Sequence, residues 1–374
     1  MKKMIHFEIR KILDKKMILI IMSFLIINIG NIIFSNCTEI SSDFYRGKKQ
    51  IINQVEGIIT QEKVDFLANG LKKNTNLVEN GNYDTEKKNE NTYTGYVYGD
   101  MNAFDEVLTS IQNTYDYHKY INDKISIIDE NIDRSHNKNA YSMFLKSRIE
   151  GRYIMSFYDS QGIEAYLNYS YTFIFLIILV ILGGVNYLYY DRNYDMENMI
   201  QITKNGKKNI RRIRYLVMFS FSIIISLIFF ISEYICFATL YDINGLFNPI
   251  YSLPNYSMSY FNMPILIMII ILIITKILGI LCLSSVILLC SQKIKFSYFT
   301  IAISFIISLF IWNTLFITNT SPLSIVHLFQ NFSVHKILSI YINDIYIIFI
   351  GLSLILCCIS GLYFIKGKKI YDTI

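Results

Sequence analysis

The chain has 374 residues, of which 53% are hydrophobic and 17% are charged, whereas soluble proteins carry about 25% charged residues. Its mean hydropathy is +0.36, which indicates a membrane protein. With 4 prolines and 6 cysteines it is neither a collagen-like chain nor a disulfide scaffold, and its net charge of +6 matters less than how that charge is distributed.

The first 16 residues predict a basic amphipathic helix that precedes the first membrane span. Ile5, Ile9, Ile12 and Leu13 share one helical face, whereas the basic side chains, Lys11 among them, lie away from that face. A helix of this kind lies flat in the membrane interface. We therefore expect an interfacial elbow helix over residues 1–16; an ordinary positively charged flank is the alternative.

Six apolar segments reach the roughly 20 residues that a membrane-crossing helix needs. They predict an all-α integral membrane protein, with one span before a long polar insert and five more within residues 171–374. No proline lies in the interior of a segment, which supports the boundaries. The six predicted transmembrane helices are 17–35, 171–190, 215–240, 264–290, 296–318 and 345–365.

Lysine and arginine gather on one side of these segments. Residues 1–16 carry six, residues 191–214 carry seven, and the short loops on the opposite side carry only Lys336. By the positive-inside rule both termini are cytoplasmic. The bias toward isoleucine, lysine, asparagine and tyrosine suggests a bacterial plasma membrane. The basic excess indicates topology and contact with anionic membrane lipid; it is no evidence for a nucleic-acid partner.

Residues 36–170, between the first two predicted spans, form the long polar insert. They carry 20 acidic and 15 basic residues and are predicted to be an extracellular domain. Apolar residues recur at helical spacing over 51–59, 104–115 and 121–128, with polar loops at 79–103 and 131–139. We expect a mainly helical stalk that rises from the first span and returns into the second.

No catalytic or nucleotide-binding motif occurs in the chain. GxxxxGK[ST], HExxH, CxxC and GxSxG are all missing, and His327 and His335, which share one loop, have no local carboxylate partner. We expect no catalytic residue, no metal site and no cofactor within this chain, and therefore no enzyme that works alone.

Glu233 and Lys276 are ionisable residues inside predicted spans. Such residues are costly in a membrane and are candidates for function. Glu233 lies seven residues from the outer end of its span and Lys276 twelve, which places them at depths of about 10 and 18 Å. Because a lysine side chain can cover much of this difference, we predict a pair that lines a translocation path. Snorkelling of the two side chains to the interface, or a shifted span boundary, is the alternative.

The loop between the second and third spans, residues 191–214, has an acidic start, a short apolar centre and a basic end. Asp195 and Glu197 precede Met199, Ile200 and Ile202. Acidic residues favour the start of a helix, and a short helix with an apolar face suits a groove in a partner protein. We predict a cytoplasmic contact helix here; a solvated loop is the alternative.

Together these features resemble the membrane subunits of type-two ABC exporters, in the subset with a large extracellular insert between the first two spans. That family has six spans, an elbow helix before the first, and a coupling helix between the second and third. Asp195 and Glu197 match the acidic pair of the family's coupling motif in spacing. Residues 198–199 stand where a glycine is expected, and Lys207 replaces an arginine after Gly206.

The resemblance implies both a function and partners. A separate ABC ATPase subunit would bind the coupling helix, and closure of two ATPase subunits on ATP with Mg²⁺ would drive export between two permease copies, or one copy and a paralogue. It leaves the substrate open among a peptide or antimicrobial, a drug and a lipid-like molecule. The alternative is a membrane sensor or immunity protein whose extracellular domain binds a peptide without transport. The implied ATPase-coupling residues are Asp195, Glu197, Met199, Ile200 and Ile202.

Overall fold

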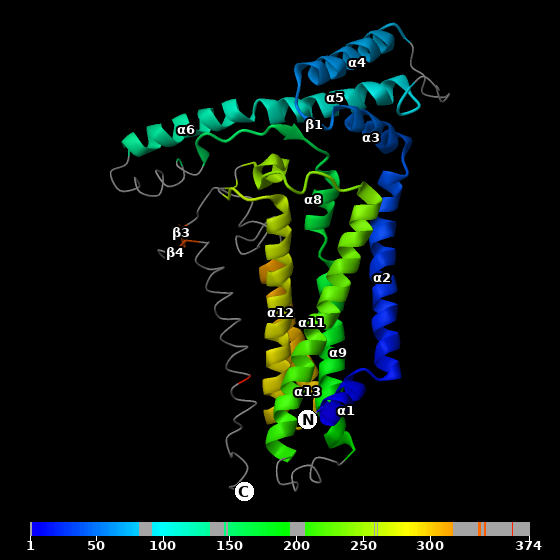
Figure 1. Ribbon diagram of the computed structural model, residues 1–374, viewed down its shortest axis with the longest axis vertical. Helices are drawn as coiled ribbons and strands as arrows, with labels where there is room; N and C mark the ends of the chain where they lie inside the picture. The colour runs from blue at the N-terminus through cyan, green and yellow to red at the C-terminus, as the bar shows by residue number, and fades with distance from the viewer. Residues whose placement is uncertain are drawn as a thin grey trace.

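The protein consists of a bundle of long helices with shorter helices lying across one end of it (Figure 1). We call that end the head end, and the opposite end, where the first helix lies, the N-terminal end. The computed structural model describes residues 2–81, 92–134, 146, 149–194, 206–257, 259, 261–316, 336–337, 340–341 and 361.

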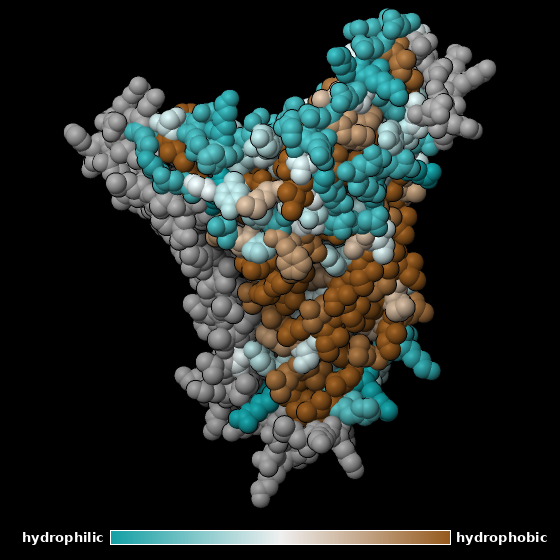
Figure 2. Space-filling model, turned by 45° about the horizontal axis from the view of Figure 1, so that its top comes forward, coloured by the Kyte–Doolittle hydropathy of each residue, from teal (hydrophilic) through white to brown (hydrophobic). Residues whose placement is uncertain are grey.

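Four of the described helices are long and apolar enough to cross a membrane. A fifth apolar helix, α13 (Ser297–Phe316), is shorter over its described apolar part. Figure 2 shows a hydrophobic band between hydrophilic surfaces at the two ends. The chain is therefore a multi-pass membrane protein of the all-α class. The four long helices are α2 (Lys15–Ile40), α9 (Tyr171–Asn193), α11 (Gly206–Tyr241) and α12 (Ile265–Lys293).

The helix boundaries differ most from the predicted spans at the end of α2 and at the start of α11. The first helix continues to Ile40 instead of ending at residue 35, and α11 begins at Gly206 instead of residue 215. Lysine and arginine are good helix formers, so the basic run that follows Gly206 extends α11. Of the predicted loop 191–214, residues 191–193 belong to α9 and residues 206–214 belong to α11. The sixth predicted span, 345–365, lies almost wholly outside the described residues, so the number of six spans stays a prediction.

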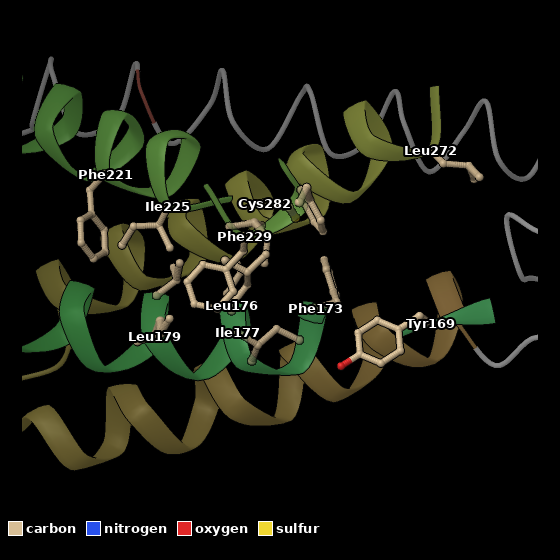
Figure 3. Packing of buried hydrophobic residues seen from close by; sticks show 14 of the residues in the cluster. Tyr169, Phe173, Leu176, Ile177, Leu179, Phe221, Ile225, Phe229, Leu272 and Cys282 are labelled. Atoms are coloured by element: carbon tan, nitrogen blue, oxygen red, sulfur yellow. The ribbon is translucent and has the colours of Figure 1, made fainter. Parts of the chain in front are cut away.

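The helix α9 forms the centre of the bundle. It contacts α1 (Lys2–Ile12), α2, α11, α12 and α13, and Figure 3 shows its side chains meeting those of α11 in the core. Phe173, Leu176 and Phe229 are almost completely buried there, whereas Phe34 on the peripheral helix α2 is 83% exposed. An apolar side chain left open in this way on a spanning helix is suited to contact lipid.

Residues 43–157 form the head, which has its own small hydrophobic core. Ile51, Leu67, Phe104 and Ile111 are buried in it. Its helices lie across the end of the bundle (Figure 1), so the predicted stalk along the bundle axis is wrong. They are α3 (Asp43–Val55), α4 (Gln61–Glu79), α5 (Val97–Tyr115) and α6 (Tyr117–Arg134).

A short antiparallel pair of strands closes the head. Strand β1 (Gly57–Ile58) pairs with β2 (Ser156–Phe157), with Gly57 opposite Phe157. The helix predicted over 51–59 ends at Val55, because Gly57 has a φ of +98° and turns the chain into β1. The pairing brings the start and the end of the head together above the bundle.

The remaining elements connect the head to the bundle or follow α13. Helix α8 (Gln161–Asn168) leads from β2 into α9 and packs on α11. Two 3₁₀ turns, η1 (Ile250–Ser252) and η2 (Pro254–Tyr256), lie between α11 and α12. Strands β3 (Lys336–Ile337) and β4 (Ile340–Tyr341) pair with each other.

Candidate functional site

The predicted ATPase-coupling residues, Asp195, Glu197, Met199, Ile200 and Ile202, lie outside the described residues. The structure describes the two helices on either side of them. Helix α9 ends at Asn193 and α11 begins at Gly206, both at the N-terminal end of the bundle (Figure 1).

Four charged side chains from three helices meet beside this segment. Lys11 of α1 donates hydrogen bonds to Glu8 Oε1 at 2.7 Å and to Asp191 Oδ1 at 2.8 Å. Arg214 of α11 bonds to the other oxygen of Asp191, and its Nε lies 4.0 Å from Glu8 Oε2. Two carboxylates and two cations therefore lie together, and their charges sum to zero. We call Glu8, Lys11, Asp191 and Arg214 the charged cluster.

The charged cluster is buried. The side chains of Glu8, Lys11 and Asp191 are between 3% and 4% exposed, and that of Arg214 is 15% exposed. The Tyr187 hydroxyl donates to Glu8 Oε2 at 2.9 Å. Because a buried charge is stable only when it is paired and hydrogen-bonded, this cluster fixes α1 against α9 and α11.

This arrangement adds a contact that the predicted amphipathic helix did not include. Lys11 lies away from the exposed apolar residues Ile9 and Leu13, as predicted, but it points into the protein, where Asp191 balances its charge. The apolar side chains of Phe7, Ile9 and Leu13 are exposed instead, at 56%, 38% and 39%. The helix thus packs on the bundle through its charges and through Ile12, which is buried, and leaves other apolar groups open, which is compatible with a position at a membrane interface.

Sequence reasoning missed Glu8, Asp191 and Arg214, because each was counted only as part of a segment. One signal was present: Glu8 is the single acidic residue among the first 13, three residues before Lys11. Residues three apart on a helix are neighbours. This pairing could have been found from the sequence, but the contacts with Asp191 and Arg214 could not.

The end of α9 is also attached to the turn between α12 and α13. The Tyr189 hydroxyl donates to the Ile294 carbonyl at 2.8 Å and lies 2.7 Å from Thr300 Oγ1. Arg192 donates to the same carbonyl at 3.0 Å. The end of α9 is therefore bonded on two sides.

The structure brings the two predicted intramembrane residues together. Lys276 Nζ of α12 lies 4.0 Å from Glu233 Oε1 of α11, and the two side chains are 12% and 0% exposed. Neither carboxylate oxygen accepts a hydrogen bond by distance and angle from the described part of the chain. The ammonium also lies 5.5 Å from the centre of the Phe230 ring. This is a buried, loosely held ion pair within the apolar band.

A hydrogen-bonded polar network lies next to this pair. Tyr169 and Thr172 both donate to Asn28 Oδ1, at 3.0 and 3.1 Å, and Asn31 donates to the Tyr169 hydroxyl at 3.1 Å. Thr172 also lies close to the Glu233 carboxylate. The network and the ion pair together involve α2, α9, α11 and α12. These four helices therefore contribute polar side chains to one neighbouring set within the bundle.

A cavity of about 540 Å³ separates the head from the bundle. It is lined by α3, α5, α6, the chain around β2, α8 and the loop before α12. Burial raises the pKa of Tyr117 in its wall to about 12, so this phenol stays neutral near neutral pH. The Tyr117 hydroxyl donates to the Ser257 carbonyl at 2.8 Å, which joins the head to the loop between α11 and α12.

Metal chemistry has little basis in the described residues. No group of three or more histidine, cysteine, aspartate or glutamate side chains could hold a metal ion among them. Comparison with protein-family models, curated proteins and solved structures finds no match for the chain.

Proposed function

We propose that this chain is the membrane subunit of an ATP-driven exporter, driven by a separate ABC ATPase subunit. The observation that carries the proposal is the charged cluster, which joins α1 to both helices that flank residues 194–205. Coupling between distant sites travels through packed, hydrogen-bonded and rigid elements. A contact helix formed by residues 195–202 would be attached to such elements on both sides.

In this proposal the N-terminal end of the bundle is cytoplasmic and the head is extracellular. The ATPase binds Asp195, Glu197, Met199, Ile200 and Ile202. Closure of two ATPase subunits around ATP and Mg²⁺ moves two permease copies, or this chain and a paralogue, relative to each other. The positive-inside distribution of lysine and arginine supports the orientation.

Glu233 and Lys276 take the role of polar residues along the path of the substrate. The 4.0 Å separation and the missing hydrogen bonds to the carboxylate within the described chain support this role. A loosely held pair in an apolar band exchanges partners at a lower cost than one with a complete set of hydrogen bonds. The substrate class stays open among peptides or antimicrobials, drugs and lipid-like molecules.

The test is to purify the tagged chain in mild detergent from its native host and identify what accompanies it. We expect a stoichiometric P-loop ATPase, and we expect the double variant Glu197→Ala/Ile200→Ala to lose this partner while it still inserts in the membrane. Lys16→Gln, an exposed change at the same end, is the control and should retain the ATPase. A pure chain without an ATPase in several detergents would remove the exporter assignment.

A second candidate function is a membrane sensor or immunity protein that binds a ligand at the head without transport. The cavity of about 540 Å³ between head and bundle favours it, because binding sites of small ligands have this size. The same purification separates the two functions, since the sensor needs no ATPase.

A further inference from the structure

The cavity between the head and the bundle is lined by more carboxylates than ammonium groups. The ionisable side chains of lysine, aspartate and glutamate that line it are Lys48, Asp116, Asp159 and Glu164. Lys48 is already paired, since its ammonium lies 2.7 Å from Glu106 Oε2, which does not line the cavity. Among the described residues, the cavity therefore presents three carboxylates and one lysine, which is already paired.

These carboxylates have only neutral hydrogen-bond donors. Glu164 Oε2 accepts from Asn255 Nδ2 at 2.6 Å, and Asp159 Oδ1 accepts from the Gln161 amide at 3.1 Å. Asp116, Asp159 and Glu164 form no ion pair with any described residue. Neutral donors fix the position of a carboxylate without cancelling its charge. The negative potential of the cavity is thus left uncompensated.

A second cation lies near the cavity but is engaged elsewhere. The Arg152 guanidinium lies 4.6 Å from the centre of the Tyr251 ring and donates to the Ser259 carbonyl. Tyr251 in turn stacks on Tyr117 with the ring centres 5.3 Å apart. Arg152 is buried and does not line the cavity. It therefore stiffens this wall and leaves the carboxylates of the cavity unpaired.

The rest of the lining is apolar and aromatic. Ile52, Val107 and Leu253 are buried in its walls, and four tyrosines complete it. Sites with apolar walls and a few fixed polar groups are typical of small-molecule binding. The described carboxylates do not converge as a metal site would. Spread charges and apolar walls fit an extended organic cation better than a metal ion. The four tyrosines are Tyr117, Tyr120, Tyr158 and Tyr251.

We propose that the cavity between the head and the bundle binds an amphipathic organic cation of about tripeptide size, with its basic group beside Asp159 and Glu164 and its apolar part against the tyrosines. Asp159 lies just before α8 and Glu164 lies in its first turn, and both line the cavity. The proposal concerns the cavity alone, and it stands whether or not an ATPase accompanies the chain.

The test uses the full-length protein in mild detergent at low ionic strength, with two N-acetylated tripeptide amides as probes. One probe is lysyl-phenylalanyl-lysine, and its neutral counterpart is glutaminyl-phenylalanyl-glutamine. Equilibrium dialysis should show the cationic peptide binding at least about tenfold more tightly. Raising the salt concentration should weaken that binding, because salt screens the attraction between exposed charges.

Two amino-acid substitutions test whether the cationic peptide binds in this cavity. Asp159→Asn/Glu164→Gln keeps the shape of both side chains and should lower the affinity for the cationic peptide about tenfold. Asp105→Asn changes an exposed carboxylate of α5 outside the cavity and should leave the affinity unchanged.

Equal affinity for the two peptides, or equal loss in both variants, would overturn the proposal. So would a result in which Ca²⁺ alone binds and loses affinity in the double variant, since that result assigns a metal site instead. The salt titration uses unaltered protein, so the proposal can fail even where the double variant does not fold.

Discussion

Lys11 Nζ lies 2.8 Å from Asp191 Oδ1, although 180 residues separate the two in the chain. This contact joins the first helix to the end of the central helix α9, directly beside the segment that we propose as the ATPase contact. The sequence alone places Lys11 and Asp191 at solvated positions, whereas in the structure they form a buried ion pair.

Replacing Lys11 with methionine should destabilise the protein by about 3 kcal/mol, because the buried Asp191 and Glu8 then share one cation. Asp191→Asn should cost a similar amount, since it leaves two cations for one carboxylate. The double variant restores the balance of charge and should cost less than the sum of the two. Size-exclusion chromatography after heating in detergent measures the effect. Lys16→Met, on an exposed side chain, is the matched control, and additive losses would contradict the pairing.

The intramembrane pair makes a comparable prediction. Lys276→Met leaves Glu233 as a buried carboxylate without its counter-charge and should cost about 3–5 kcal/mol. Adding Glu233→Gln removes that charge and should recover most of the loss. The same heating assay applies, with the exposed Lys293→Met at the other end of α12 as control. A double variant as unstable as Lys276→Met alone would show that the two residues do not interact.

The contact between α8 and α11 depends on the absence of a side chain at Gly162. A Cβ atom there would overlap Tyr241 Cβ and lie 3.0 Å from its Cγ. These atoms cannot move without shifting α11, so Gly162→Ala should destabilise the folded protein by about 1–3 kcal/mol. Gly30→Ala meets no atom within 4 Å and should stabilise α2 by about 0.5–1 kcal/mol. Equal melting temperatures of these two variants would contradict the packing.

The orientation can be tested with two cysteines at opposite ends of the bundle. Cys37 is exposed near the head end of α2, and Cys290 is partly buried near the C-terminal end of α12, which lies at the N-terminal end of the bundle. In variants that keep only one cysteine each, a membrane-impermeant maleimide should label Cys37 in intact cells. It should label Cys290 only after the membrane is opened. The reverse pattern would place the head in the cytoplasm.

Much of the architecture follows from the sequence, because apolar length and helical periodicity are local properties. The spans at 17–35, 171–190 and 215–240 each lie within a long helix, and so does 264–290 apart from Pro264, which caps α12. The errors are at the ends, where basic residues or the polar residues before Ser41 extend a helix. The meeting of Glu233 and Lys276 was also foreseeable. Two isolated opposite charges at similar depth in an apolar medium lower their energy by pairing.

Apolar length and helical periodicity are sufficient to predict an all-α, multi-pass membrane protein with a polar helical insert. The cluster of Glu8, Lys11, Asp191 and Arg214, and the position of the head across the bundle above an acidic cavity, become visible only in the folded chain. Each of those charged residues looks solvated within its own segment. Burying them becomes favourable only when folding brings opposite charges from distant segments into contact, and local periodicity carries no information about that pairing.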